Sequence, residues 1–272
     1  MSLGQTLQQL HNAFPQSDQK MPTLFVGHGN PLNAIEDNEF SRSWTEVGHA
    51  LPKPNAILCI SAHWETRGTQ VTGMEHPRTI HDFGGFPRAL YEAQYPAPGS
   101  PALAQLTQET VQKAEVYLDQ TWGLDHGTWS VLANMFPDAT IPVVQLSLDR
   151  TQDPQFHYDL GKELQALRNR GVLIIGSGNV VHRLSAFQFE DIAYDWALEF
   201  DDTIKHLIED RNHDAIIHYQ RLGRAAQLSI PTNEHYLPLL YVLALQDRQE
   251  QTRFFADKVT FGSISMRSVW IE

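Results

Sequence analysis

Four short apolar runs punctuate the first two-thirds of the chain. Each is rich in β-branched or aliphatic residues and is bounded by residues that form turns. This pattern indicates buried strands rather than helices. The runs cover residues 22–27, 56–61, 141–148 and 172–175.

Between and after these runs, apolar residues recur every three or four positions, which is the spacing of amphipathic helices. Residues 1–20 show the same spacing and predict an N-terminal helical extension. Two further strands are expected, a short edge strand at 115–118 and a C-terminal strand at 262–271. The other predicted helices cover residues 37–50, 101–114, 154–170, 191–210, 212–224 and 236–245.

A strand, a helix and a second strand in succession predict a parallel β-α-β unit. The sequence therefore predicts an α/β fold with a central mixed, largely parallel sheet flanked by helices. A chain of 272 residues is within the size of one large core, so we expect a single domain over residues 1–272. In such sheets the ligand crevice lies at the carboxyl ends of the strands, where we expect the functional site.

One connection is unusually long. Residues 66–100 are rich in Gly, Pro, His and aromatic residues and contain one short predicted helix at 88–93. A connection of this length is uncommon unless it forms a binding loop or a lid. A structural surface loop is the alternative.

Composition narrows the function classes. A net charge of -12, from 20 basic and 32 acidic residues, argues against a nucleic-acid partner. No apolar stretch is long enough for a membrane span, and the N-terminus has no signal-peptide pattern. The single cysteine, Cys59, lies in a predicted strand and is expected to be structural and inert, so the sequence indicates a reducing cytoplasm.

Histidine is the residue type that stands out, with 13 copies. Some lie in predicted helices among polar neighbours, and we expect those to face solvent. They are His11, His49, His157, His206, His213 and His218.

Five other histidines lie where strands end or helices begin. His28 and His63 follow apolar strands directly, and His182 follows one after a Gly-rich turn. His126 and His235 each open a predicted helix. Each alone is as well explained by a structural role, but together they predict one metal crevice.

Imidazole and carboxylate ligands with open positions suit Zn²⁺ or non-haem Fe(II). Glu65, Asp125 and Glu234 are the neighbouring carboxylates, and they are expected either to ligate the metal or to orient a histidine from behind. None of the spacings matches a local signature such as HExxH, so the ligand set stays open at this point.

The segments GHGNPLNA, SAHWE, IHDFGGFP, DHGTW, GSGNVVH and NEHYLPLLY, in this order from about Met21 onwards, resemble the class III extradiol ring-cleavage dioxygenases. Within that family the likeness is to 4,5-DOPA dioxygenase extradiol-like proteins. The resemblance implies one mononuclear metal, Fe(II) for oxygenase activity, with Zn²⁺ as a second candidate for the bound ion. It also implies cleavage of a catechol such as L-DOPA beside its two hydroxyls, with both atoms of O2 entering a muconic semialdehyde.

Carried over by position, the resemblance makes His28, His63 and His235 metal ligands. His182 resembles either a fourth ligand or the acid/base residue, and His126 a second catalytic histidine near the substrate. Protocatechuate-type relatives use a glutamate as third ligand, and Glu234 and His235 are adjacent here, so three or four histidine ligands remain open. Further expected roles are substrate contacts for Ser177, Asn179 and His81, and support from behind the ligands for Glu65 and Glu234.

Two rival functions follow from the same residues. A zinc hydrolase would use the metal to activate water, with Glu65 or Glu234 as base. A non-enzymatic binding protein similar to the Memo proteins is the other. The expected partners are a small-molecule catechol and O2, with no nucleic acid and no membrane, and the sequence leaves monomer and dimer open.

Overall fold

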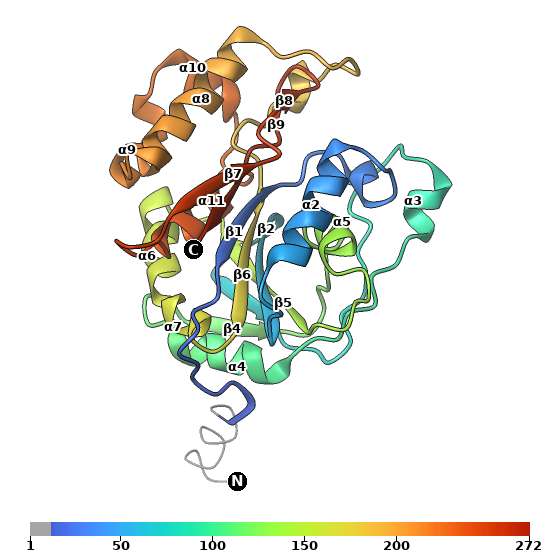
Figure 1. The fold of residues 1–272 in the computed structure, drawn as a ribbon, viewed down its shortest axis with the longest axis vertical. Helices are drawn as coiled ribbons and strands as arrows, with labels where there is room; N and C mark the ends of the chain where they lie inside the picture. Colours follow the sequence, from blue (N-terminus) through green and yellow to red (C-terminus); the bar gives the residue numbers. More distant parts are fainter. Residues whose placement is uncertain (1–11) are drawn as a thin grey trace.

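The centre of the computed structural model, which describes residues 12–272, is an eight-stranded sheet (Figure 1). Its strands are β1 (Thr23–Gly27), β2 (Ala56–Thr66), β3 (Thr69–Thr72), β4 (Val116–Asp119), β5 (Val143–Asp149), β6 (Val172–Gly178), β7 (Thr252–Phe255) and β10 (Ser268–Ile271). A separate two-stranded sheet is formed by β8 (Val259–Thr260) and β9 (Ile264–Ser265).

The strand order is β4-β3-β5-β2-β6-β1-β10-β7. The four central strands β5, β2, β6 and β1 are parallel to one another. Both flanks add antiparallel pairs, β3 against β5 on one side and β10 against β1 and β7 on the other. The predicted α/β domain with a mixed, largely parallel sheet is confirmed.

Helices cover both faces of the sheet because successive side chains of the central strands point to opposite faces. In β1, Leu24 and Val26 belong to one core cluster and Phe25 to the other. Figure 1 shows α2 and α5 on one side of the strands and α6 and α7 on the other. These helices are α2 (Glu39–Ala50), α5 (His126–Met135), α6 (Pro154–Glu163) and α7 (Gln165–Arg168).

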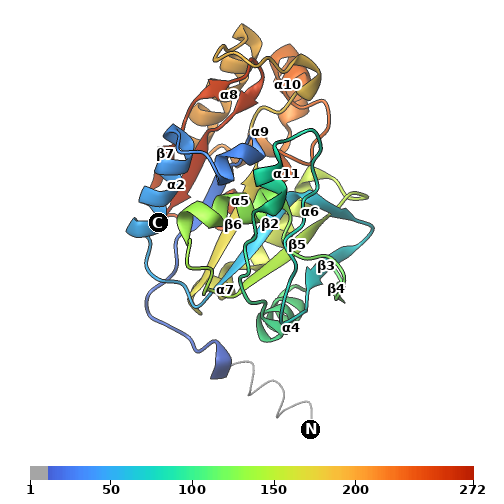
Figure 2. The same cartoon turned by 90° about the vertical axis from the view of Figure 1, so that its right-hand side faces the viewer.

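The segment after β6 forms a helical region beyond the ends of the central strands, where α8 and α10 lie in Figure 2. A buried ion pair between Arg267, just before β10, and Asp201 in α8 ties this region to the sheet (2.5 Å). No helix in residues 12–272 is long and apolar enough to cross a membrane. The remaining helices are η1 (Pro31–Ala34), α3 (Arg88–Glu92), α4 (Pro101–Thr110), η2 (Leu184–Ala186), α8 (Asp195–Glu209), α9 (His213–Ile217), η3 (Tyr219–Arg221), α10 (Arg224–Ser229) and α11 (Leu237–Ala244).

Several predicted boundaries were wrong. β2 continues to Thr66 because its pairing with β5 shifts register between Ile60 and Glu65, so the ladder resumes after the apolar run ends. The predicted helix at 154–170 breaks at Leu164, and the predicted strand at 262–271 divides into β9 and β10. Residues 1–11 of the predicted N-terminal helix, His11 among them, lie outside the described residues. The rest of that prediction was wrong, because residues 14–20 are not helical.

His157 is a further correction, because the structure buries it completely instead of exposing it to solvent. Its Nδ1 lies 3.0 Å from the hydroxyl of Tyr241 in α11, so this part of α6 faces the core. Burial disfavours the imidazolium form and lowers the pKa of His157 to about 4. His49 and His206 are exposed as expected.

His157 should make the fold acid-sensitive. Between its unfolded pKa of 6.5 and its folded pKa of about 4, the unfolded chain binds a proton that the folded chain does not, so the free energy of unfolding falls as the pH falls. The H157Q variant should lack this slope and lose about 3 kcal/mol less than the wild type across the window.

Urea unfolding at a series of pH values from 7 to 4 measures the difference, and all other histidines cancel because both chains carry them. Parallel curves for wild type and H157Q would contradict the assignment.

Candidate active site

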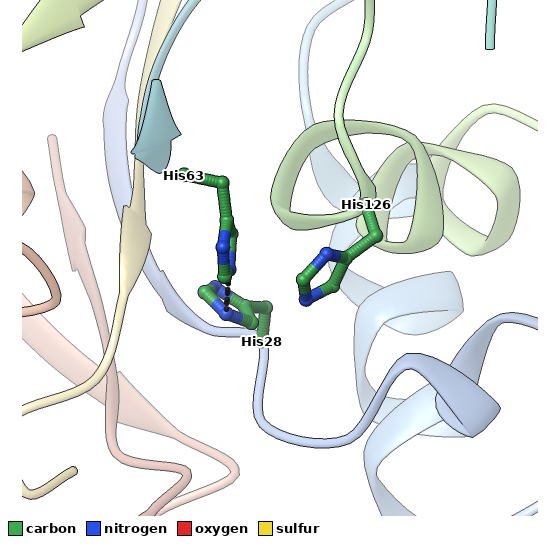
Figure 3. A group of neighbouring side chains, drawn as sticks. All are labelled: His28, His63 and His126. Atoms are coloured by element: carbon green, nitrogen blue, oxygen red, sulfur yellow. Dashed lines mark hydrogen bonds between the residues drawn. The ribbon is translucent and has the colours of Figure 1, made fainter. Parts of the chain in front are cut away.

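Five histidine side chains converge at the carboxyl ends of the central strands. His28 follows β1, His63 lies inside β2 rather than after it, and His126 is the first residue of α5. His182 lies beyond β6, and His235 immediately precedes the turn into α11. Figure 3 shows three of the rings, those of His28, His63 and His126, turned toward one another.

The rings are close enough to share one ion. The ring centroid of His28 lies 4.9 Å from that of His63 and 5.0 Å from that of His235. The His63 and His235 centroids are also 5.0 Å apart. Histidines from five separate segments thus form a single cluster, at the edge where ligands bind in such sheets.

The tautomer of His28 is fixed by Ser177. The Ser177 hydroxyl donates its only proton to the carbonyl of Gly127 (2.5 Å), so its oxygen is left to accept a proton from His28 Nδ1 (3.0 Å). Since a neutral imidazole carries one ring proton, Nε2 of His28 is an unprotonated lone-pair donor.

Asn179 fixes His235 in the same way. Its amide nitrogen donates to the Ser265 carbonyl (2.8 Å), which turns its oxygen toward His235 Nδ1 (3.1 Å). His235 therefore also presents an unprotonated Nε2. The backbone adds to this, because the Asn179 N–H donates to the His235 carbonyl (2.8 Å).

Asp82, from the long loop before α3, faces the other two rings. Its Oδ2 lies 3.5 Å from His63 Nδ1, which favours the proton on that nitrogen, and its Oδ1 lies 3.0 Å from His126 Nδ1. The second contact lacks hydrogen-bond alignment, but the same oxygen accepts the backbone N–H of His126 (2.9 Å). Burial opposes ionisation of Asp82, yet hydrogen bonds and charge from His126 outweigh it and lower its pKa to about 2.

The consequence is visible between His28 and His63. Their Nε2 atoms are 3.0 Å apart, within hydrogen-bond distance (Figure 3). Nε2 of His28 is unprotonated, so it can accept the proton of His63 Nε2 or, when the His63 proton is on the Nδ1 that lies 3.5 Å from Asp82, share a cation with His63 Nε2. Two nitrogens about 2.1 Å from one tetrahedral ion would be roughly 3.4 Å apart, so a small adjustment accommodates a metal.

The ionisation behaviour agrees with this donor set. Burial, and then the charges of neighbouring histidines, holds the pKa of His28, His63 and His235 well below the usual value. The three rings are therefore neutral at pH 7, the form in which histidine binds metals. The residues present thus fit a mononuclear metal with imidazole ligands.

Behind the rings, a fully buried carboxylate joins β2, β5 and α5. Asp125 caps the N-terminus of α5 and accepts hydrogen bonds from the Ser61 hydroxyl and the Gln145 amide, both at 2.6 Å. Its neighbour Gly127 lies so close to β2 that a Cβ there would be 2.5 Å from Ser61 Oγ and 2.9 Å from His63 Cδ2. The glycine allows the helix carrying His126 to approach the strand carrying His63.

His182 lies at the edge of the cluster. Its ring stacks on that of His235, with centroids 3.4 Å apart and planes 10° from parallel, and it lines an adjoining cavity of about 380 Å³. Burial, followed by the charge of His126, lowers its pKa to about 4. Two groups of side chains have one ligand atom from each residue within 4.8 Å of the others and could hold a metal ion: His28, His63 and His126, and His182, Glu234 and His235.

The structure gives other expected site residues different contacts. Ser177 and Asn179, expected to contact the substrate, are fully buried and bond to the rings of His28 and His235. His81 turns away from the cluster: its Nε2 bonds to the Ala93 carbonyl (2.9 Å), and its ring packs beside Trp129. Glu65 is exposed, and the Glu234 carboxylate accepts a hydrogen bond from the Thr232 hydroxyl.

Sequence reasoning did not place Asp82 in the site. The signal was its position next to His81 in the long loop, but nothing in the sequence shows which of the two side chains turns toward the metal crevice.

Comparisons with known proteins identify the family of the chain. Residues 3–269 match the family model described as the catalytic LigB subunit of aromatic ring-opening dioxygenase. The 4,5-DOPA dioxygenase extradiol of Escherichia coli (strain K12) is 48% identical over 262 residues, 94% of this chain and 96% of the relative. The protein of the same description from Mirabilis jalapa is 35% identical, over 85% of this chain and 89% of the relative.

A solved structure shares the fold. The crystal structure of the uncharacterized protein JW3007 from Escherichia coli K12 superposes with a TM-score of 0.82 at 43% identity, covering 93% of this chain and all of that one. Together with the histidine cluster, these matches show that the chain belongs to the LigB family of class III extradiol dioxygenases and is a metal-dependent oxidoreductase.

Proposed function

We propose that this chain cleaves catechols such as L-DOPA next to the two hydroxyls and inserts both atoms of O2 to give a muconic semialdehyde. In this proposal Fe(II) is held by Nε2 of His28, His63 and His235. The observation that carries it is the convergence of three buried imidazoles: Nε2 of His28 and of His63 are 3.0 Å apart, and the His235 ring centroid lies 5.0 Å from the centroids of both rings.

Bound Fe(II) supplies the one-electron chemistry that a catechol needs to react with O2. Zn²⁺ is the other candidate for the bound ion, because three neutral imidazoles suit it equally well and it would leave the oxygenase inactive. Asp82, whose pKa is lowered, contributes negative charge close to His63 and His126, which offsets the charge of a divalent ion.

The chain's own residues move the protons. His182, neutral at pH 7 because its pKa is about 4, accepts a proton from a catechol hydroxyl at a free ring nitrogen and returns it later in the reaction. His126 is the second candidate, since it lies across the cluster with its ring centroid 3.9 Å from that of His63. Ser177 and Asn179 orient ligands, and the loop bearing Asp82 covers the rings and limits water.

Membership in a dioxygenase family favours this reaction over a zinc hydrolase. The rival needs a carboxylate base aimed at a metal-bound water. The Glu65 side chain is exposed, which makes it a weak candidate for that role.

The direct test is reconstitution. The apoprotein is loaded anaerobically with Fe(II) and mixed with L-DOPA in air, and we expect equal consumption of L-DOPA and O2 with formation of a yellow semialdehyde chromophore. Zinc-loaded protein is the matched control and should consume no O2. Substrate loss without O2 uptake, or no reaction with any of a panel of catechols, would refute the proposal.

The metal content of variants should distinguish a metal ligand from the proton-transfer residue. H63A should abolish stoichiometric metal binding, whereas H182A should retain most of the metal and lose turnover. H49A, which removes an exposed histidine of α2, is the control for one histidine fewer. Metal analysis after gel filtration gives the result, and if H182A loses metal as fully as H63A does, His182 is a ligand first.

The tautomer argument predicts the effect of Ser177. In S177A the acceptor for His28 Nδ1 is gone, so the ring is free to carry its proton on Nε2, and Zn²⁺ affinity should fall about 10- to 100-fold. S17A removes the hydroxyl of an exposed serine that is distant in the sequence from Ser177, and it should bind Zn²⁺ like the wild type. Competition with a chromophoric chelator measures both, and equal affinities for S177A and wild type would contradict the role given to Ser177.

A further inference from the structure

A cavity with aromatic walls opens beside the histidine cluster. It has a volume of about 380 Å³, and His182 forms part of its wall. Phe86, Phe187 and Phe261 also line it, and the rings of Phe187 and Phe261 stack with centroids 5.1 Å apart. Phe189, at the rim, is 90% exposed. Small-molecule sites commonly span about 300–1,000 Å³, so a cavity of this size next to the proposed reaction site suits a ring substituent of the substrate.

The cavity wall has little polar surface, and none of it is acidic. In the part of the chain that the structure describes, the polar side chains of the wall are those of His182 and Asn30. Glu234, the carboxylate grouped with His182, does not line the cavity. Asn30 is half-buried and comes two positions after His28, so it lies where the cavity meets the metal crevice.

The orientation of the Asn30 amide is fixed by the helix that follows it. Its Oδ1 accepts the backbone N–H of Leu32 (3.0 Å) and so caps η1. Because the Leu32 N–H is a donor, the amide oxygen must face it, and Nδ2 lies on the other side of the planar group. Nδ2 donates to no acceptor within residues 12–272. The wall therefore carries an oriented N–H donor that is available to a ligand.

The long loop adds backbone donors to the same wall. Gly84 and Gly85 line the cavity, and neither N–H forms a backbone hydrogen bond among the described residues. A Cβ at either position would meet no atom within 4 Å apart from its chain neighbours, so a ligand has room to approach this backbone closely. Unpaired N–H groups in a cavity wall favour a ligand with acceptor oxygens, and a charged acceptor most strongly.

A positive charge without an ion pair lies next to the wall. Arg183 stands in the sequence between His182 and Leu184, which both line the cavity. Its guanidinium donates to the Leu228 carbonyl (3.2 Å), and no carboxylate of residues 12–272 forms a salt bridge with it. A neutral carbonyl does not compensate the charge of Arg183, so the arginine favours an anion nearby.

We propose that Asn30 is a specificity-determining residue that binds a carboxylate on the ring substituent of the substrate. This inference rests on the proposed ring cleavage and names the substrate class of that same site, catechols with an anionic substituent, to which L-DOPA belongs. Nδ2 of Asn30 donates to a carboxylate oxygen, the N–H groups of Gly84 and Gly85 supply further donors, and the charge of Arg183 favours the anion. The phenylalanine rings contact the apolar part of the substituent.

The test compares kcat/KM of the Fe(II)-loaded protein within two pairs of catechols. 3-(3,4-Dihydroxyphenyl)propionate is paired with its methyl ester, and L-DOPA is paired with dopamine, so the carboxylate is lost within each pair. A hydrogen bond to a charged group should make each acid about 10- to 100-fold better than its partner. Equal values, or a preference for the partners without a carboxylate, would overturn the proposal.

Two variants link the preference to named residues. N30D keeps an oxygen for the Leu32 N–H but replaces the Nδ2 donor with a charged oxygen, so the ratio of acid to ester should fall by at least about tenfold. N212D makes the same substitution at the N-cap of α9 and should keep the wild-type ratio. R183Q, which removes the charge, should lower the ratio severalfold and make it less sensitive to salt.

An unchanged ratio in N30D, with folding confirmed by circular dichroism, contradicts the role of Asn30 and leaves ring cleavage intact. If no catechol is cleaved, ring cleavage fails, and calorimetric affinities of the zinc-loaded protein for the same compounds decide the carboxylate preference. The acids should then bind at least about tenfold more tightly than their partners in the wild type and lose that advantage in N30D. Equal affinities in the wild type would overturn the proposal.

Discussion

The site depends on which nitrogen of each histidine carries its proton. The Ser177 hydroxyl and the Asn179 amide nitrogen each donate to a backbone carbonyl. The side-chain oxygen of each residue therefore accepts from the ring that faces it. That single constraint leaves Nε2 unprotonated on His28 and His235. Asp82 acts in the same direction on His63. Unprotonated nitrogens in a buried histidine cluster are suited to bind a metal ion.

The fold supports this arrangement with close backbone contacts. A Cβ at Gly178, the last residue of β6, would lie 2.0 Å from the His235 carbonyl, so the strand end and the turn before α11 pack directly. Gly127 allows the equivalent approach of α5 to β2. The β1, β2 and β6 strands are parallel neighbours, and their carboxyl ends bring His28, His63, Ser177 and Asn179 to one place. Substitution at either glycine would move a ligand, not merely a loop.

The sequence was sufficient to predict the α/β fold and the convergence of the histidines. Strong apolar runs mark the parallel strands, and residues at the carboxyl ends of parallel strands lie along the same edge of the sheet. It was insufficient where contacts between distant segments decide the structure and the local sequence pattern is weak. The register shift in β2 lets the ladder resume beyond the apolar run, which places His63 inside a strand. His157 has polar sequence neighbours but faces Tyr241, and Asp82 acquires its role only from how the long loop folds back. The exposed aromatic rim near His182 likewise has no periodic pattern that would predict it.

The central claim is that Nε2 of His28, His63 and His235 bind one metal ion. Anomalous diffraction at the iron edge, from crystals grown anaerobically with Fe(II), tests it most directly. The account predicts one iron peak bonded to those three atoms, with Nδ1 of His28 and His235 still hydrogen-bonded to Ser177 and Asn179. Iron bound through Nδ1 of these rings, or at a position that none of the three contacts, would contradict it.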